Sequence, residues 1–378
     1  MAWEVWWALV LGFLLSGIVQ AWVPRSRMER ALGGRDLRAV ALATGMGAAS
    51  SSCSYAATAI ARSLFQKGAS FATAMVFQFA STNLVFEIGI VLWIFIGWRF
   101  TLAEFVGGIF LVALMWLGTR LFITRRLESE ARAHAEAARA GHQHASGSGW
   151  PAVAFNFRGD WQMLWKEITA GFVIAGFIAL LPLSFFNDLF VTDASAPVRL
   201  LENVVVGPLV AVLSFVCSVG NVPLAAVLWA GGISFSGVIA FIYADLIVLP
   251  IVWIYAKFYG WKITWRLVAI MFVTMVAAAL VVDGIFSAAD LVPTHRPSID
   301  SIANRGITWN YTTALDIVAF VVFAALIGLT LRRGATDPVC GMTVERSTPH
   351  TSRRDGKTFY FCSAHCQKRF DAGGLVGK

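Results

Sequence analysis

Long apolar runs separated by short polar stretches make up most of this chain. Several runs have about 20 residues, the length that an α-helix needs to cross the roughly 30 Å hydrocarbon core of a bilayer. The pattern therefore predicts an all-α polytopic membrane protein. The predicted spans are Trp3–Val23, Phe71–Trp98, Leu102–Ile123, Ile168–Phe186, Phe235–Phe258, Thr264–Phe286 and Thr312–Leu331.

Two shorter apolar pieces, Val40–Ser63 and Val204–Gly231, are broken near their centres by small and polar residues. The first contains the run SSSCSY and the second contains VCSVGNVP. Gly and Pro weaken a helix, and each polar group is costly in hydrocarbon unless it finds a partner. We therefore expect each piece to form two half-length helices that meet at the interruption.

Basic residues give the orientation of the spans. Cytoplasmic loops of membrane proteins are enriched in Lys and Arg. The basic residues cluster in loops and at span ends, at Arg25, Arg27, Arg30, Arg35, Arg38, Arg125, Arg126, Lys257, Lys262, Arg266, Arg332 and Arg333. These loops are therefore expected in the cytoplasm, with the N-terminus outside and the C-terminal domain inside.

This orientation constrains the two broken pieces. The chain is inside at Arg38 and inside again at Arg125, and only two full spans lie between these residues. Val40–Ser63 must therefore enter and leave the bilayer on the same side, as a re-entrant hairpin. By the same count, Val204–Gly231 is a second re-entrant hairpin that enters from the outer side.

The two hairpins resemble each other in sequence. A shift of 164 residues, without gaps, pairs identical residues across the two pieces and the spans that follow them. Chance matches between apolar helices give Leu, Ala and Val, whereas this register also matches Cys, Ser and Gly. The matched pairs are Cys53 with Cys217, Ser54 with Ser218, Ala61 with Ala225, Leu64 with Leu228, Gly68 with Gly232, Ser70 with Ser234, Phe71 with Phe235, Phe77 with Phe241 and Ala80 with Ala244.

Copies that enter a membrane from opposite sides form an inverted repeat, which with discontinuous helices is typical of secondary transporters. Thiolates favour soft metals, and the neighbouring hydroxyl and amide groups can hydrogen-bond a solute. The candidate substrate-binding residues are Cys53, Ser54, Cys217, Ser218 and Asn221. In the alternative, the small residues only let helices pack closely.

Glu87 and Asp245 lie inside predicted spans. Ionisable groups at that depth are costly and often mark an ion or proton pathway, so both are candidate coupling residues. The alternative is a hydrogen-bonded structural role. The sequence has no P-loop pattern and no motif of a known catalytic site, so a secondary transporter is predicted rather than an ATPase or another enzyme.

Composition agrees with this class. Of the 378 residues, 58% are hydrophobic and 14% are charged, whereas soluble domains carry about 25% charged residues. The net charge of +8 follows from the basic loops, so no nucleic-acid partner is expected. The partners expected are the lipid bilayer and a transported solute, and assembly into a homo-oligomer is left open. The segment Arg125–Ser148 is predicted to form a short solvent-exposed helix and a flexible linker.

The C-terminal tail has a different chemistry. Its cysteines are spaced C-x21-C-x3-C, at Cys340, Cys362 and Cys366. Three thiols suit Zn²⁺ or Cu⁺, and Asp337 and His365 could complete the ligand set, with His365 as the candidate fourth ligand. The run Phe359–Phe361 is expected to form a short strand and to supply a small core. A domain of about 40 residues needs such a metal to be stable.

The motifs of the tail, DPVCGM, YFC and CxxxC, resemble a YHS domain of the heavy-metal-associated TRASH type. The membrane part resembles the ArsP-like predicted permease family over roughly residues 1–333. The shared features are two Cys-Ser motifs, each followed by a Gly-x-Ser loop and an apolar helix. The resemblance implies efflux of trivalent organoarsenicals or related thiophilic compounds across the bacterial inner membrane.

The sequence thus predicts a multi-pass permease with a small cytoplasmic α+β domain that binds Zn²⁺ or Cu⁺. The expected units are residues 1–124, a first membrane repeat; 125–165, a polar linker; 166–333, a second repeat with the last span; and 334–378, the metal-binding domain. We expect efflux of a thiophilic metal, metalloid or organoarsenical. Two alternatives are a permease for another small solute or sulfur-containing anion with a regulatory tail, and a membrane-anchored metal chaperone or sensor.

Overall fold

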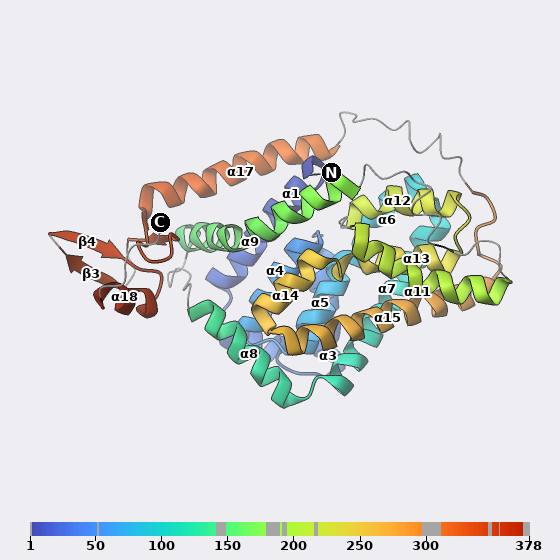
Figure 1. Cartoon of the computed structure of the whole chain (residues 1–378), viewed down its shortest axis with the longest axis horizontal. Helices are drawn as coiled ribbons and strands as arrows, with labels where there is room; N and C mark the ends of the chain where they lie inside the picture. The colour runs from blue at the N-terminus through green and yellow to red at the C-terminus, as the bar shows by residue number, and fades with distance from the viewer. Residues whose placement is uncertain are drawn as a thin grey trace.

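The computed structural model describes residues 2–50, 53–140, 149–178, 190, 195–214, 218–296, 311–346, 350–354 and 356–372 (Figure 1). The first part of the chain forms α1 (Ala2–Trp22), α2 (Arg25–Leu32), α3 (Leu37–Ser50), α4 (Ser54–Gln66), α5 (Phe71–Asn83), α6 (Phe86–Phe95), α7 (Trp98–Phe122), α8 (Arg125–Ala140) and α9 (Trp150–Ile178). The later part forms α11 (Ala196–Ser214), α12 (Ser218–Ala230), α13 (Phe235–Tyr243), the 3₁₀ turn η1 (Ala244–Leu246), α14 (Leu249–Tyr259), α15 (Trp261–Ala288) and α17 (Tyr311–Arg333).

The helices form two groups. In the first, α1 packs against α9 and α17, and these helices lie along one side of the molecule (Figure 1). In the second, α3 packs on α5, α11 on α13, and α7 on α15. The helix α4 joins the groups because it contacts both α1 and α5. The interior of the second group is therefore built from both halves of the sequence.

Among the described residues, four helices are long and apolar enough to cross a membrane, or up to six if each bent pair forms one span. The four are Phe71–Phe95, Trp98–Phe122, Trp261–Ala288 and Thr313–Arg333, all within or close to predicted spans. The predicted span Trp3–Val23 corresponds to α1. The predicted span Ile168–Phe186 begins in α9, and its residues after 178 lie outside the described residues.

The predicted span Phe235–Phe258 is not one straight helix. It consists of α13 and α14, which meet at a 41° bend with η1 between them. Pro250 lies in the first turn of α14, where its missing N–H and fixed φ are tolerated, whereas inside a continuous helix its ring would clash with a carbonyl one turn back. Asp245 lies in this break. The span from Phe71 is likewise interrupted, between Asn83 and Phe86.

The 164-residue register also appears in the elements. The last residue of α12, Ala230, follows the last residue of α4, Gln66, by 164 positions. Ser70 and Ser234 each accept a hydrogen bond from the backbone N–H three residues later, which caps α5 and α13. Gly68 and Gly232 both have φ near +105°, a region that favours glycine (φ +108° and +104°).

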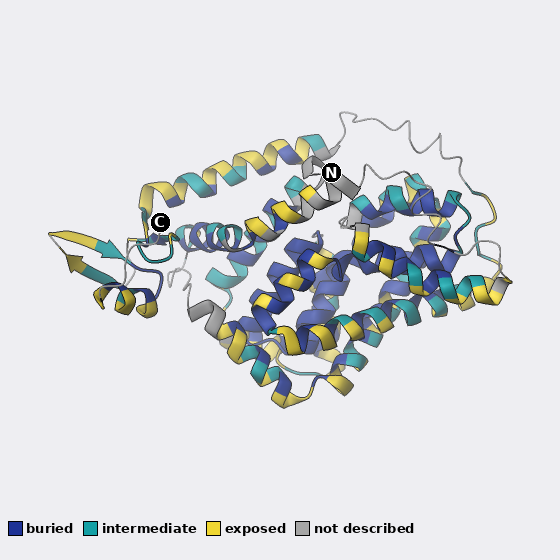
Figure 2. Ribbon diagram, viewed as in Figure 1, coloured by how far each residue is buried: buried dark blue, intermediate teal, exposed yellow. Residues whose placement is uncertain are grey.

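Large apolar side chains are exposed on the outside of the helices, as a lipid-facing surface requires (Figure 2). Examples are Ile109 on α7, Trp253 on α14, Val273 on α15 and Val321 on α17. In a protein surrounded by water, so many exposed apolar residues would promote aggregation. Their distribution is that of a multi-pass membrane protein.

The helix α8 forms within the predicted polar segment, but it is not fully solvent-exposed. Its residues Leu127, Ala131 and Ala135 are buried, and the helix packs against α4 and α14. Because α8 has few large apolar residues and many charged ones, its sequence did not predict that one side of the helix is buried. Small Ala side chains let it approach the bundle closely, and Glu128 and Arg132 also point inward, whereas Arg125 and Arg126 are exposed.

The tail folds as the expected small α+β unit. It contains the antiparallel pairs β1 (Gly334–Thr336) with β2 (Thr343–Glu345) and β3 (Thr351–Arg354) with β4 (Lys357–Tyr360), followed by α18 (Ala364–Asp371). Its own core consists of Val344, Phe361, Cys362, Cys366 and Phe370. The predicted strand at Phe359–Phe361 overlaps β4, with Phe361 just beyond it.

Candidate functional site

The interruption between α3 and α4 lies against the break between α13 and α14. Cys53 is the N-cap residue of α4 and is buried, and Ser54 is the first residue of the helix. The Ser54 hydroxyl donates a 2.7 Å hydrogen bond to Oδ2 of Asp245, and both side chains are buried. Two residues that the sequence assigned to different roles, substrate binding and coupling, therefore form one unit.

Four further contacts close a ring of hydrogen bonds around this unit. Thr58 donates to the Ser54 carbonyl at 2.7 Å, and the Gln78 amide donates to the Thr58 hydroxyl at 2.7 Å. The same amide donates to the Tyr255 hydroxyl at 2.6 Å, which donates to the Leu246 carbonyl at 3.2 Å. Leu246 follows Asp245, so the ring links α4, α5, η1 and α14. We call these residues the polar ring.

The polar ring was only partly predictable. Ser54 and Asp245 were predicted from the sequence as site residues, whereas Thr58, Gln78 and Tyr255 were not. Gln78 is a polar residue in the middle of a predicted span, and that signal could have identified it. Thr58 and Tyr255 gave no such signal, because Thr and Tyr are common in membrane helices and at their ends. Their roles depend on the packing of α4 against α5 and α14.

A second buried acid was overlooked. Glu104 lies inside the predicted span Leu102–Ile123 and is completely buried in α7. Its charge and that of Asp245 interact. Tyr243 approaches α7 at the same level and donates a 3.0 Å hydrogen bond to the carbonyl of Ala103. Gly107, one turn later, makes room for this hydroxyl, because a Cβ there would overlap it.

The structure places the other candidates differently. Asn221 is completely buried in α12, and its side-chain amide has no hydrogen-bond partner among the described residues. Ser218 begins α12, but its side chain lies outside the described part of the structure, as does all of Cys217. Glu87 is half-buried in the first turn of α6 and is not a member of the polar ring.

An arginine holds the turn that follows each hairpin. Arg132 of α8 donates to the carbonyls of Phe65 and Ala69, and its guanidinium lies 4.2 Å from the centroid of the Phe65 ring. Arg296 donates to the carbonyls of Trp229 and Ile233 and lies 3.9 Å from the centroid of the Trp229 ring. Each donor and each acceptor is shifted by 164 positions. The pair Arg132 and Arg296 was not among the matched residues predicted from the sequence.

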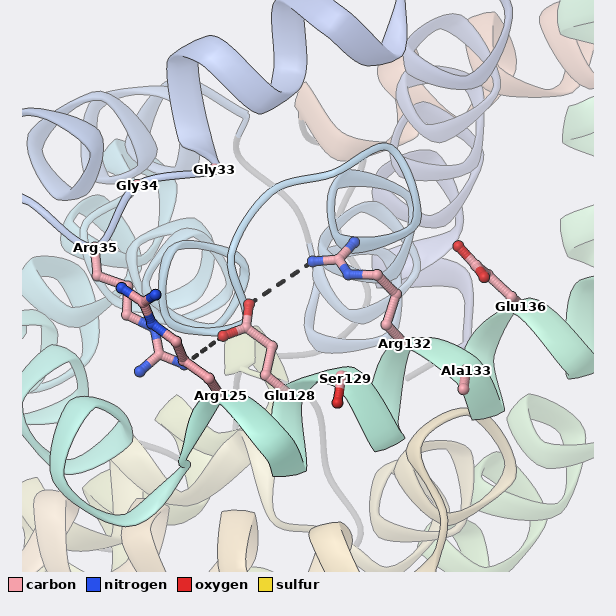
Figure 3. Close-up of a pocket in the computed structure, with 9 residues that line it drawn as sticks. All are labelled: Gly33, Gly34, Arg35, Arg125, Glu128, Ser129, Arg132, Ala133 and Glu136. Atoms are coloured by element: carbon pink, nitrogen blue, oxygen red, sulfur yellow. Dashed lines mark hydrogen bonds and ion pairs between the residues drawn. The ribbon is translucent and has the colours of Figure 1, made fainter.

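Arg132 also borders a cavity of about 610 Å³ between α8 and the loop before α3 (Figure 3). Glu128 projects from α8 into it, between Arg132 and Arg35. Its carboxylate accepts a 2.8 Å hydrogen bond from the backbone N–H of Phe71, at the start of α5. A negative charge at a helix N-terminus is stabilising, so Glu128 fixes the start of α5. None of the residues that line this cavity belongs to the polar ring.

A buried ion pair anchors the first hairpin to the other helix group. Arg62 of α4 and Asp160 of α9 form it, and both are almost completely buried. Asp160 also accepts hydrogen bonds from Ser16 at 2.7 Å and from Gln20 at 2.8 Å, both on α1. The Arg62 guanidinium lies 4.5 Å from the centroid of the Phe258 ring. This network ties α1, α4, α9 and α14 together.

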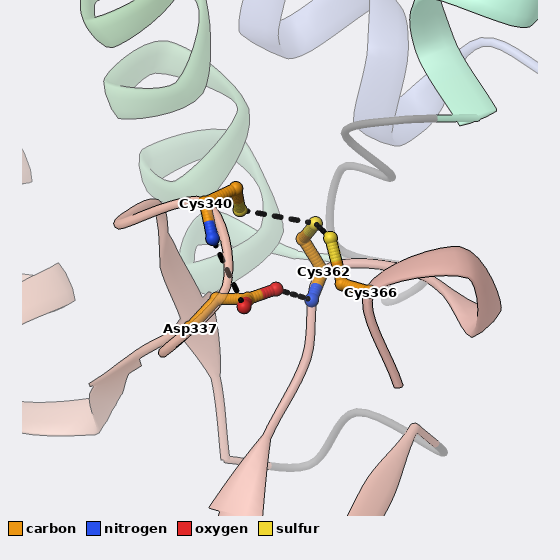
Figure 4. A group of neighbouring side chains, drawn as sticks. All are labelled: Asp337, Cys340, Cys362 and Cys366. Carbon is orange, nitrogen blue, oxygen red and sulfur yellow. Dashed lines mark hydrogen bonds between the residues drawn. The ribbon is translucent and has the colours of Figure 1, made fainter. Parts of the chain in front are cut away.

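The tail brings a separate set of soft ligands together (Figure 4). One ligand atom from each of Asp337, Cys340, Cys362 and Cys366 lies within 4.8 Å of the others. The Cys340 and Cys362 sulfurs are 3.5 Å apart, as are those of Cys362 and Cys366. Two thiolates about 2.3 Å from one tetrahedral zinc are about 3.8 Å apart, so three thiols and one carboxylate fit such an ion.

Hydrogen bonds hold Asp337 in place. Its carboxylate accepts 2.8 Å hydrogen bonds from the backbone N–H groups of Val339 and Cys362. Burial alone would raise the pKa of Asp337, but these hydrogen bonds outweigh burial and lower it below the usual value. The carboxylate is therefore charged at neutral pH, as a metal ligand must be.

The cysteine thiols hold their protons more firmly than usual. Hydrogen bonding with the Cys340 thiol, together with burial, raises the pKa of Cys362, and burial raises the pKa of Cys366 to about 11. A bound cation would reverse this balance, because it deprotonates a coordinating thiol. His365 is exposed at the start of α18 and is not a member of the ligand group, whereas Asp337 is.

Together, apolar helices broken at buried polar residues and a tail with clustered thiols define a multi-pass membrane protein with a small domain that could hold a metal ion. The chain belongs to the ArsP-like predicted permease family, whose model matches residues 1–284. A YHS domain model matches residues 335–373. The Mycobacterium tuberculosis (strain ATCC 25618 / H37Rv) protein named "Putative permease Rv2963" is 43% identical over 348 residues, which cover 87% of this chain and 85% of that protein. No solved structure matches the chain.

Proposed function

We propose that this permease is a secondary transporter that exports a thiophilic metal, metalloid or organoarsenical across the bacterial inner membrane. Its two halves form an inverted repeat with re-entrant hairpins at α3–α4 and α11–α12, the N-terminus outside and the tail in the cytoplasm. The substrate would bind between the hairpin interruptions, at Cys53, Ser54, Cys217, Ser218 and Asn221. Asp245 would couple this site to proton movement.

The hydrogen bond between Ser54 and Asp245 supports this proposal most directly. It joins the interruption of one hairpin to the break of a span in the other half of the sequence. A solute that displaced this bond would change contacts in both halves at once, which is the requirement for alternating access. Cys53 lies next to Ser54 at the N-terminal end of α4, where the helix dipole favours a thiolate.

Buried Asn221 supports a binding role for the second hairpin. An amide without a partner in a dry interior costs free energy, and such groups often await a ligand. Its counterpart in the first hairpin is Ala57, so the two halves are not chemically equivalent. The tail supports a soft substrate, because three thiols and a carboxylate form a second thiophilic site on the same chain. We propose that the tail binds Zn²⁺ or Cu⁺ and delivers or senses the ion.

Transport of methylarsonous acid, a trivalent organoarsenical, into inside-out vesicles tests the proposal. Wild-type vesicles should accumulate the compound, and Cys53→Ser should abolish accumulation. Thr44→Ala is a matched control on the same hairpin, because the Thr44 hydroxyl donates a local hydrogen bond to the Val40 carbonyl within α3. Equal accumulation by Cys53→Ser, Cys217→Ser and wild type would show that the hairpin sulfurs do not bind substrate.

Removal of residues 335–378 separates the transporter from the alternative of a membrane-anchored chaperone. A transporter without its tail still moves a solute that is supplied directly to the vesicles. Vesicles that lose all flux without the tail would favour the chaperone or sensor.

A further inference from the structure

Glu104 is a buried acid that the polar ring does not include. It lies in the second turn of α7, about 9 Å from the helix start at 1.5 Å per residue, and is completely buried. Neither of its oxygens has a hydrogen-bond partner among the described residues. An ionised carboxylate in such a place is strongly disfavoured, so the group is stable only with a bound proton or cation.

The helices α5, α6, α13 and α15 pack closely against α7. These elements carry Glu87 on α6, Tyr243 on α13, and Lys262, Arg266 and Asp283 on α15. The neighbour of Gly107 on α15 is Val282, about 24 Å along that helix from Arg266. The Tyr243 hydroxyl lies beside this turn of α7 and is neutral. A neutral neighbour does not compensate an ionised carboxylate, which favours a proton on the Glu104 carboxyl.

Glu104 and Asp245 also occupy different depths. In the orientation expected from the basic loops, α7 and α13 both begin at the outer side of the bilayer. Glu104 lies about 9 Å from the start of α7, and Asp245 about 15 Å from the start of α13. Glu104 is therefore nearer the outer surface than Asp245, and Asp245 reaches the hairpin interruption through Ser54.

We propose that Glu104 is a proton-binding site that receives a proton from the outer side and exchanges it with Asp245. This inference rests on the proposed function and deepens it, since it makes the exporter a proton antiporter with two carboxyls in series. Protonation of Asp245 converts it from an acceptor-only carboxylate to a carboxylic acid and weakens its bond from Ser54. The hairpin interruption would then be released when a proton arrives, and a proton leaves when substrate binds.

The first test measures protonation directly and needs no substrate. Infrared difference spectra of the full-length protein in lipid, recorded over a pH titration, should show the C=O band of a protonated carboxylic acid that Glu104→Gln removes. Asp316→Asn is the matched control, because Asp316 is a buried acid in α17 that accepts a hydrogen bond from the Trp7 backbone. It should leave the Glu104 band in place. Glu104→Asp should keep a carboxylic acid band and shows that the site tolerates substitution.

The second test uses methylarsonous acid in proteoliposomes. In Glu104→Gln, the accumulation driven by a pH gradient should fall at least tenfold. Movement of the compound down its own concentration gradient should remain. Asp316→Asn should retain both. If the wild-type protein moves no methylarsonous acid, the proposed substrate is wrong, and the infrared measurement alone decides the role of Glu104. An unchanged infrared band in Glu104→Gln overturns the inference, as does full proton-driven accumulation by this variant.

Discussion

Arg132 and Arg296 make the same set of contacts 164 positions apart. Each donates to the carbonyl of an aromatic residue near the end of a hairpin helix and to the carbonyl four residues later. Each also places its guanidinium over the ring of that aromatic residue, Phe65 or Trp229. Arg132 thus fixes the turn after α4, and Arg296 fixes the turn after α12.

Loss of either arginine should loosen the hairpin beside it. A hydrogen bond from a charged donor contributes about 1.5–3 kcal/mol, less when partly exposed to water, and a partly buried cation–π contact about 1 kcal/mol. We expect Arg132→Ala and Arg296→Ala each to lower the melting temperature of the purified protein by several degrees. Lysine should rescue only partly, because it cannot form the forked pair of bonds. Arg120, on the exposed surface near the end of α7, provides the control Arg120→Ala. If these variants and the control have the same melting temperature, the two arginines do not brace the hairpins.

The Ser54–Asp245 bond should be needed for transport more than for stability. Ser54→Ala removes the donor and leaves Asp245 able to take a proton, so we expect reduced methylarsonous acid flux with a folded protein. Asp245→Asn keeps an acceptor of similar size but removes the titratable group, so proton-driven flux should disappear. The measurements are vesicle flux and thermal unfolding of the same preparations. If the variants unfold at lower temperature but show no selective loss of flux, the bond has a purely structural role.

The Arg62–Asp160 pair should behave as a buried ion pair. Removal of one partner leaves an uncompensated buried charge and typically costs about 3–5 kcal/mol. We expect Arg62→Met or Asp160→Leu to give little folded protein. The double variant should recover much of the loss, because well-packed apolar residues can replace a buried pair. Expression and melting temperature of all three variants give the coupling between the residues, and additive losses would contradict the expectation.

The tail should bind one zinc-like ion through three thiols and a carboxylate. In the full-length protein, Cys362→Ser and Asp337→Asn should each weaken metal binding, whereas His365→Ala should leave it nearly unchanged. Second-sphere and ligand changes commonly cost tenfold or more in affinity. Competition with a colorimetric chelator measures the affinity. A larger loss for His365→Ala than for Asp337→Asn would show that the histidine replaces the carboxylate when metal is bound.

Local sequence patterns determined the elements. Apolar length predicted the spans near Phe71–Phe95, Trp98–Phe122 and Trp261–Ala288, because hydrocarbon thickness sets how many apolar residues a helix must have. Gly68 and Ser70, with their counterparts at 232 and 234, fixed the same turn and cap in each half through φ preference and a local hydrogen bond. The grouping of the three tail thiols was predictable because their spacing is typical of a soft-metal site, although His365 does not join them.

Only the tertiary structure decided which polar groups meet. Asp245 lies 191 residues from Ser54. From the sequence, Asp245 and Glu87 were both coupling candidates, and nothing indicated the contact with Ser54. Glu104 and Gln78 stand in apolar helices whose facing side is set by packing, and weak periodicity in a membrane helix does not reveal which face is buried. The choice of Asp337 over His365 likewise followed from backbone hydrogen bonds that turn the carboxylate toward the thiols. Long-range contacts of this kind depend on how helices pack, and residue order alone does not specify that packing.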